Sequence, residues 1–263
     1  MFDPLRRSLI TLTTLGACLP PQAWAQARGK RPLTEGPRVS ADPAVIDSGL
    51  SARWQAAMSH DLGWAAQFNP VESSLVLDQL DQGQTDVGLF LSIPKADSLD
   101  RQGLIYERHT LAVTEVVLVG PTDDVAGIRA ETDAGRALTQ VIVAASAGKA
   151  AWKAPAADSA VASLADQLTG GLASKGLRAG TAPAIKGPAY QLLTRAALAR
   201  GGQPAGTKIW PLSDPRLALE LQVALSFRSR HAAGKLMVTW LQWPLAQGIV
   251  GKSQPAWRRV AKS

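Results

Sequence analysis

Three turns in this sequence combine hydroxyl or ammonium side chains with a helix end or a loop, which is a chemistry suited to anion binding. The turns are Asp47-Ser48-Gly49, Ser73-Ser74 and Ser146-Ala147-Gly148-Lys149. Free N–H groups at a helix start, together with the helix dipole, attract an oxyanion, and a nearby hydroxyl group adds a donor. A lysine in such a turn would add a point charge. The candidate ligand-binding residues are therefore Ser48, Ser73, Ser146 and Lys149.

Each of these candidates also has an ordinary structural explanation. Ser48 and Ser73 suit helix capping, which uses the same hydroxyl group and needs no ligand. Ser146 and Lys149 suit an exposed surface loop. Asp42, close before the first turn, would repel an anion. Both explanations stay open for all three turns.

Catalytic and metal-binding motifs are absent from the sequence. His60, His109 and His231 are isolated from one another, and no H-E-x-x-H, G-x-S-x-G or Walker A pattern occurs. The pair Asp123-Asp124 is explained better by turn formation than by acid–base chemistry. The only cysteine, Cys18, lies near the N-terminus, so a cleaved product has no thiol. We predict that the protein is not an enzyme and uses no cofactor or metal.

Length and charge agree with a binding protein. The 263 residues are enough for one two-lobed protein or two small domains. The net charge of +7 suits an anionic ligand or nucleic acid, but the basic residues are scattered and form no stripe. No apolar run of about 18 residues, as a membrane span requires, follows the N-terminal segment. We predict no nucleic-acid partner and no transmembrane span in the mature chain.

The first 25 residues have the pattern of a secretory signal peptide. Arg6-Arg7 is followed by an apolar stretch, and Ala23-Trp24-Ala25 fits a cleavage site. The arginine pair also fits the twin-arginine route. Leu15 to Cys18 resembles a lipobox, which would leave a lipid on Cys18, and an uncleaved anchor is the third alternative. We predict a periplasmic protein, with residues 26–33 as a flexible lead-in.

The rest of the chain alternates strand and helix patterns, which is typical of an α/β fold with parallel pairing. Short runs of β-favouring residues predict strands at 38–40, 68–71, 87–93, 111–120, 141–145, 208–212 and 217–227. Apolar periodicity and capping residues predict helices from 50, from 73 to 82, and at 133–140, 159–168, 188–198 and 232–249. We expect Asp47 or Ser48 to cap the first helix, and the last to bend or restart near Pro244.

The run from Leu111 to Gly120 organises this pattern. It is rich in β-favouring residues, stops at a Gly-Pro pair, and suits a buried strand with parallel neighbours. We interpret it as a strand that crosses between two lobes, and Leu217 to Phe227 as the return crossing.

Three pieces around this run match a known pattern. Gln82 to Pro94 is similar to R-G-D-A-D-V-x-L-V-H-D-P, Gln102 to Arg108 to E-G-x-x-x-x-R, and Thr114 to Ile128 to N-D-F-V-L-V-G-P-x-D-D-P-A-G-I. The match has no gap from Gln102 to Ile128, and weaker similarity extends over residues 42–251. On these residues the chain resembles the tungstate-binding (Tup-type) family of ABC-transporter substrate-binding proteins.

The resemblance implies an α/β, two-lobed type II periplasmic-binding-protein fold with two crossing strands. Lobe 1 would comprise residues 34–113 and 215–263, and lobe 2 residues 114–214. The implied function is periplasmic solute binding for an ABC importer, with an ABC permease as partner and an oxyanion such as tungstate or molybdate as the family ligand. Tyr190, on the family's A-Y-T-L-T-D-R pattern, becomes a further candidate ligand residue, with core packing as its alternative.

The chain departs from the family at two anion-binding motifs. Ala41 to Val45 replace a run of hydroxyl residues, and Ala147 replaces an arginine. We therefore predict that tungstate and molybdate bind weakly or not at all, and the ligand stays open between another oxyanion and a small molecule. The second hypothesis is a binding-protein relative that acts in sensing or protein interaction, without transport.

Overall fold

The computed structural model describes residues 36–176, 187–229 and 231–260. The predicted signal peptide, residues 1–25, and the lead-in, residues 26–33, lie outside these ranges. None of the described helices is long and apolar enough to cross a membrane. The first strand, β1 (Arg38–Ala41), lies where the sequence predicts it.

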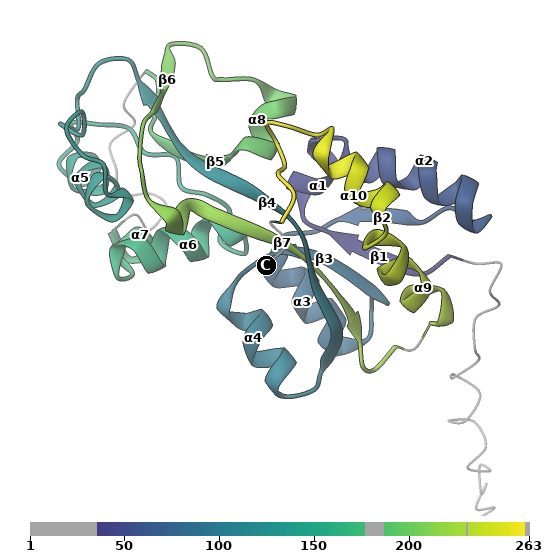
Figure 1. The fold of residues 1–263 in the computed structure, drawn as a ribbon. Coiled ribbons are helices and arrows are strands. Elements are labelled where there is room, and N and C mark those ends of the chain that lie inside the picture. The colour runs from purple at the N-terminus through teal and green to yellow at the C-terminus, as the bar shows by residue number, and fades with distance from the viewer. Residues whose placement is uncertain (1–35, 177–186, 230, 261–263) are drawn as a thin grey trace, which may run out of the picture. The chain divides into compact units, whose positions relative to one another are not determined.

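Five strands form the sheet of the first lobe, in the order β2-β1-β3-β7-β4 (Figure 1). β1 pairs in parallel with β2 (Gln67–Pro70) and with β3 (Val87–Leu91). β7 (Ala218–Ser226) is antiparallel to both β3 and β4 (Ile105–Pro121). Segments from early and late in the chain therefore lie side by side in this sheet.

β4 continues into a second lobe and changes its partners on the way. Ile105–Glu115 pair with β7, whereas Val116–Pro121 pair with β5 (Gln191–Thr194) and β6 (Thr207–Trp210). The predicted crossing strand is confirmed. Its predicted parallel pairing is wrong, because β5, β6 and β7 are all antiparallel to it. The prediction failed because Val116 to Gly120 are all buried in succession, and an antiparallel strand covered on both faces has the same continuous apolar sequence as a parallel one.

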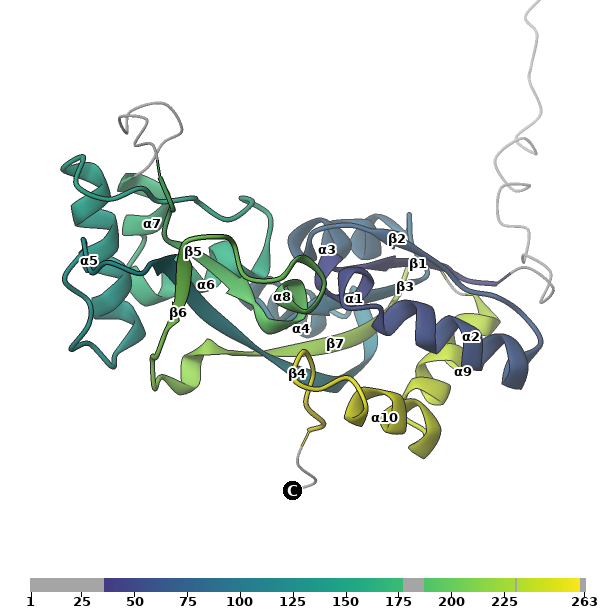
Figure 2. The ribbon, with the colours of Figure 1, turned by 90° about the horizontal axis from the view of Figure 1, so that it is seen from above.

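Helices cover both faces of the first-lobe sheet (Figure 2). A Cβ atom on Gly88 of β3 would touch Val76 and Leu80 on one face, whereas the neighbouring Val87 faces Gly234 on the other. The helices of this lobe are α1 (Pro43–Asp47), α2 (Leu50–Leu62), α3 (Ser73–Gln82), α4 (Pro94–Arg101), α9 (Ala232–Leu241) and α10 (Pro244–Gly251). The predicted break near Pro244 is confirmed, since this proline begins α10.

The first long helix, α2, forms as predicted but begins differently. Leu50, Trp54 and Met58 lie one turn apart and are fully buried. The residue before the helix is Gly49, in the left-handed conformation with φ +72° and no side-chain cap. The expected cap by Asp47 or Ser48 is wrong, because Asp47 ends the preceding helix α1 and Ser48 follows it as the C-cap.

The second lobe contains two segments whose structure differs from the prediction. Residues 141–145, predicted as a strand, belong to α5, whose buried positions repeat with helical spacing. The helix predicted from residue 188 begins only after β5, where the Thr194 hydroxyl accepts the N–H of Ala197. The helices of this lobe are α5 (Ala134–Ser146), α6 (Ala160–Thr169), α7 (Leu172–Gly176), α8 (Arg195–Gly201) and the short 3-10 helix η3 (Pro215–Leu217).

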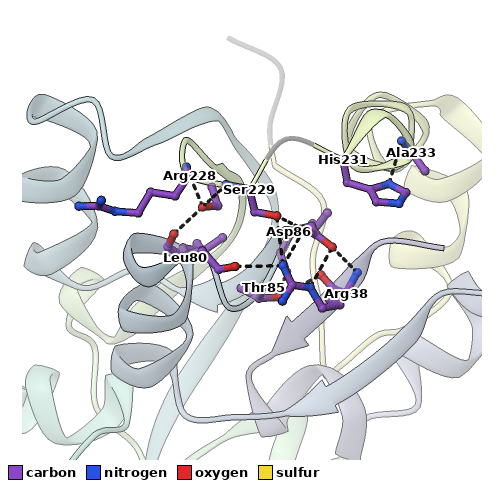
Figure 3. A network of polar contacts seen from close by, with 11 residues as sticks. Arg38, Leu80, Thr85, Asp86, Arg228, Ser229, His231 and Ala233 are labelled. Carbon is purple, nitrogen blue, oxygen red and sulfur yellow. Dashed lines mark hydrogen bonds and ion pairs between the residues drawn. The ribbon is translucent and has the colours of Figure 1, made fainter. Parts of the chain in front are cut away.

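A polar network joins the ends of β1, β3 and β7 (Figure 3). Asp86, directly before β3, accepts the N–H of Arg38 at 2.8 Å and its guanidinium at 3.0 Å. The Ser229 hydroxyl donates to the same carboxylate. The Asp86 side chain is only 3% exposed. The carboxylate therefore holds together three strands that are distant in sequence.

The segment after α10 returns to β4 where that strand crosses between the lobes. Arg258 and Val113 exchange two backbone hydrogen bonds, each 2.8 Å long. The Thr114 hydroxyl donates to the carbonyl of Ala256 at 2.9 Å. The indole N–H of Trp257, a fully buried residue, donates to the Ser48 hydroxyl at 2.8 Å. Through these hydrogen bonds, the segment connects the part of β4 that crosses between the lobes to the end of α1.

Candidate functional site between the two lobes

A cleft of about 250 Å³ lies between the two lobes. The first lobe lines it with the start of α1, the residue before α3 and the end of β3. The second lobe lines it with residues 153–156 and 159–161, with β5 and with the start of α8. Both lobes therefore contribute side chains to one cleft, as a two-lobed binding site requires.

Asp42 is the most buried charged residue of the cleft, at 4% exposure. It follows β1 and caps α1, so that its carboxylate accepts the N–H of Ala44 at 2.9 Å. The hydroxyl of Ser73 donates to the other carboxylate oxygen at 2.5 Å. Burial raises the pKa of Asp42 above its ordinary value, and this effect outweighs the opposing hydrogen bond from Ser73.

Ser73 lies at the start of α3, next to this cleft, and is fully buried. Besides donating to Asp42, its hydroxyl accepts the N–H of Leu91 at 2.9 Å. The expected N-cap at Ser73-Ser74 is wrong, because Glu72 is the N-cap and forms no side-chain capping bond. The hydroxyl group predicted to face a ligand is therefore engaged by a carboxylate and a strand of its own lobe.

The charges that line the cleft are mainly negative. Asp42, Asp47 and Glu72 line it, and Lys153 is its only lining cation among the described residues. Asp47 is paired with Arg200 of α8 at 2.5 Å, across the two lobes. Burial raises the pKa of Glu72, and the nearby Asp42 and Asp158 carboxylates act in the same direction. Within the described part of the chain, an anion in the cleft would therefore meet two carboxylates, Asp42 and Glu72, that have no arginine partner.

A second contact between the lobes uses the backbone. The N–H of Ser74, in the first turn of α3, donates to the carbonyl of Asp158 at 3.0 Å. Asp158 lies between Ala156 and Ser159, which both line the cleft from the second lobe. An N–H that an anion would use at the start of α3 is thereby bonded to the opposite lobe.

The other predicted ligand residues lie away from this cleft, so that the structure does not bring the five candidates together. The Ser48 hydroxyl is bonded to Trp257. Ser146 ends α5 and donates to the carbonyl of Ile142 at 2.9 Å, and Lys149 lies exposed in the turn that follows. Tyr190 is fully buried, and its ring lies against Gly120. Their ligand-binding roles stay predictions.

Sequence reasoning missed Glu72 and Lys153 as cleft residues and Asp158 as a contact beside the cleft, and it considered Asp42 only as a repelling charge. One signal for Asp42 was available, since an Asp-Pro pair before apolar residues is typical of a helix start. The other three are ordinary surface residue types. They come to lie at or beside the cleft only because the two lobes approach each other in the fold. Within the described ranges, no group of three His, Cys, Asp or Glu residues is arranged to hold a metal ion.

The crossing strands and the cleft define a two-lobed α/β binding-protein fold of the type II periplasmic class. No family model matches the chain, and no curated protein matches its sequence. Solved structures do match. The tungstate ABC transporter protein from Geobacter sulfurreducens is 19% identical with a TM-score of 0.64, over 83% of this chain and 98% of that one.

Two further structures are similar over their whole length. The tungstate-binding protein TupA from Desulfovibrio alaskensis G20 is 14% identical with a TM-score of 0.63, over 86% of this chain and 99% of that one. An ABC-type phosphate transport receptor from Vibrio cholerae is 12% identical with a TM-score of 0.59, over 86% and 100%. The fold implied by the resemblance to tungstate-binding proteins is confirmed.

Proposed function

We propose that the chain is a periplasmic solute-binding protein that serves an ABC importer. The observation that carries this proposal is the cleft lined by both lobes, at the side of two strands that connect them. In such a fold a small solute contacts both lobes at once, and its binding free energy favours the closed arrangement. The solved relatives named for tungstate and phosphate support the same class of function. An ABC permease is the implied partner.

A ligand screen tests this function directly. Thermal unfolding of the purified protein is measured with oxyanions, amines and neutral metabolites. A solute at about 100 times its dissociation constant should stabilise the protein by about 2.7 kcal/mol. Small-angle X-ray scattering should then show a decrease in radius of gyration with that solute. A screen in which no solute stabilises the protein would contradict the proposal.

Tungstate and molybdate are the first solutes to test by calorimetry, because of the resemblance. We expect weak or undetectable binding, since Ala147 stands where the family has an arginine and the remaining cleft charges are mainly carboxylates. Loss of one charge-assisted hydrogen bond weakens binding by roughly ten- to a hundredfold. Nanomolar affinity would contradict this expectation. Binding that is unchanged in Ser73→Ala and Lys149→Ala would remove these two residues from the site.

Export through a cleaved signal peptide is the second part of the proposal. The Ala23-Trp24-Ala25 motif predicts cleavage after Ala25. N-terminal sequencing of protein from the periplasm should therefore begin at Gln26. A lipid-modified Cys18 at the N-terminus would contradict this and assign the protein to the membrane surface.

The alternative function is a relative that senses or binds another protein without transport. The hydrogen bond between Ser74 and Asp158 favours it, because the lobes already contact each other through the chain's own groups. Genes for a permease and an ATPase beside this one would support transport. A solitary gene, together with a negative ligand screen, would support the alternative.

A further inference from the structure

We propose that Asp42 determines the charge selectivity of the cleft, by placing the chain's own carboxylate where an anionic solute would bind. The cleft therefore excludes oxyanions and accepts a neutral or positively charged solute. This inference rests on the proposed function, since it assigns solute binding to the same cleft.

The contacts of Asp42 are those that a bound anion would make. One carboxylate oxygen accepts the Ala44 N–H at 2.9 Å, and the other accepts the Ser73 hydroxyl at 2.5 Å. Ser73 is fully buried, so no solvent competes for its hydroxyl group. A solute oxygen could reach this donor only by displacing a carboxylate that is covalently part of the chain and thus always present.

A second potential donor is occupied from the opposite side of the cleft. The Ser74 N–H donates to the Asp158 carbonyl at 3.0 Å. The start of α3 is thus bonded to one acceptor from each lobe, Asp42 and Asp158. An entering oxyanion would have to break both contacts, whereas a neutral or cationic solute can leave them in place.

The charge around this position works in the same direction. Glu72, directly before α3, also lines the cleft, and its carboxylate has no hydrogen-bond or ion-pair partner among the described residues. Asp47 is already paired with Arg200. Lys153 remains as the one lining cation of the described chain, and its side chain is exposed. The negative charges of Asp42 and Glu72 therefore repel an anion and attract an ammonium group.

The test replaces Asp42 by serine, which removes the charge and frees the donors that the carboxylate occupies. Calorimetry at neutral pH with tungstate, molybdate and inorganic phosphate should show affinity for at least one of these anions roughly ten- to a hundredfold higher in Asp42→Ser than in the wild type, the range of one charge-assisted hydrogen bond. Unchanged affinity for all three anions in a folded variant would overturn the proposal.

Asp81→Ser is the matched control. It removes the same charge from the same lobe, but Asp81 lies near the far end of α3, is not among the residues that line the cleft, and is paired with Arg228 at 3.5 Å. Its affinity for the three anions should stay within about threefold of the wild type, since the net charge alone acts through solvent. An equal gain in both variants would overturn the assignment to Asp42.

A second variant covers the case in which Asp42→Ser does not fold. Asp42→Asn keeps the shape and the cap of α1 and removes only the charge. A gain of about tenfold for an anion in Asp42→Asn supports the proposal, and no gain overturns it. The proposed function fails separately, when neither the wild type nor any variant binds a solute from the neutral, cationic and anionic sets.

Discussion

Two buried aspartates in the first lobe have opposite electrostatic environments. Burial alone would raise the pKa of Asp86, but hydrogen bonds from Arg38 and Ser229 and the Arg38 charge outweigh it, and the pKa lies below its ordinary value. Asp42 has hydroxyl and N–H partners but no cation among the residues that the structure describes, and burial holds its pKa above the ordinary value. Asp86 therefore stabilises the fold in its charged form, whereas the charge on Asp42 costs stability.

Asp86→Asn should destabilise the protein by about 2–3 kcal/mol at pH 7, because it leaves the Arg38 guanidinium with weaker acceptors. The lowered pKa sets the sign of the pH dependence. The contribution of Asp86 is present above the pKa of the unfolded chain and is lost as the pH falls through the folded-state pKa. Urea unfolding of wild type and variant should thus differ at pH 7 and converge in acid.

The matched control is Asp78→Asn, which removes a carboxylate paired with Lys95 at 2.7 Å on the surface of the same lobe. The two side chains are 43% and 34% exposed, so the loss should stay below about 1 kcal/mol. Equal losses in both variants would contradict the special role of the buried pair.

The candidate site was only partly predictable at the level of residues. The resemblance directed attention to Ser73, which does lie next to the cleft. Its partner Asp42 is 31 positions away, and no local pattern predicts that these two side chains meet. The contact depends on β1 and β2 pairing in parallel, which brings the segments after both strands, with Asp42 and Ser73, to one edge of the sheet.

At the level of elements, patterns with a strong period were predicted well. β4 and the buried face of α2 appear as expected. The strand predicted at residues 141–145 failed because its β-branched residues lie within a longer helical repeat of Ala137, Leu138, Val141 and Ile142, all buried on one face of α5. A stretch of five residues shows the β propensity of its side chains but is too short to show the helical repeat.

β4 contains a position where only glycine fits. A Cβ atom on Gly120 would overlap the ring of Tyr190, which is fully buried and flanked by Trp210. Because an aromatic ring in a packed core cannot move aside, Gly120→Ala should destabilise the protein by about 1–3 kcal/mol in chemical unfolding. Gly201→Ala, at a helix end with open space around it, should stay within about 1 kcal/mol of the wild type. A neutral Gly120→Ala would show that the second lobe is more loosely packed than described.

For the whole molecule, β4 is the element that both lobes share. Its first half belongs to the sheet with β7 and its second half to the sheet with β5 and β6. The Asp47–Arg200 ion pair and the Ser74–Asp158 hydrogen bond join the lobes at the cleft. The described residues accordingly form one compact unit by their contacts. The boundaries at residues 113/114 and 214/215 remain a prediction.

We expect the two lobes to unfold together in one transition, because melting either lobe removes half of β4 from its sheet. The test uses a variant with Trp152→Phe and Trp210→Phe, in which the described tryptophans that remain all lie in the first lobe. Its tryptophan fluorescence reports the first lobe, and far-UV circular dichroism reports both. Coincident urea midpoints would support shared unfolding, and two separated midpoints would contradict it.

The return of residues 256–258 to β4 also affects the order in which the fold can be completed. The second lobe and most of the first are synthesised before Arg258 exists to bond with Val113. The strand β7, which lies between β3 and β4 in the first-lobe sheet, also comes after the whole second lobe. A ribosome must therefore have made almost the entire chain before the first lobe can close. A nascent chain whose first lobe is incomplete stays unfolded there. A translocation pore that accepts only unfolded polypeptide could therefore bind the chain at any time during its synthesis.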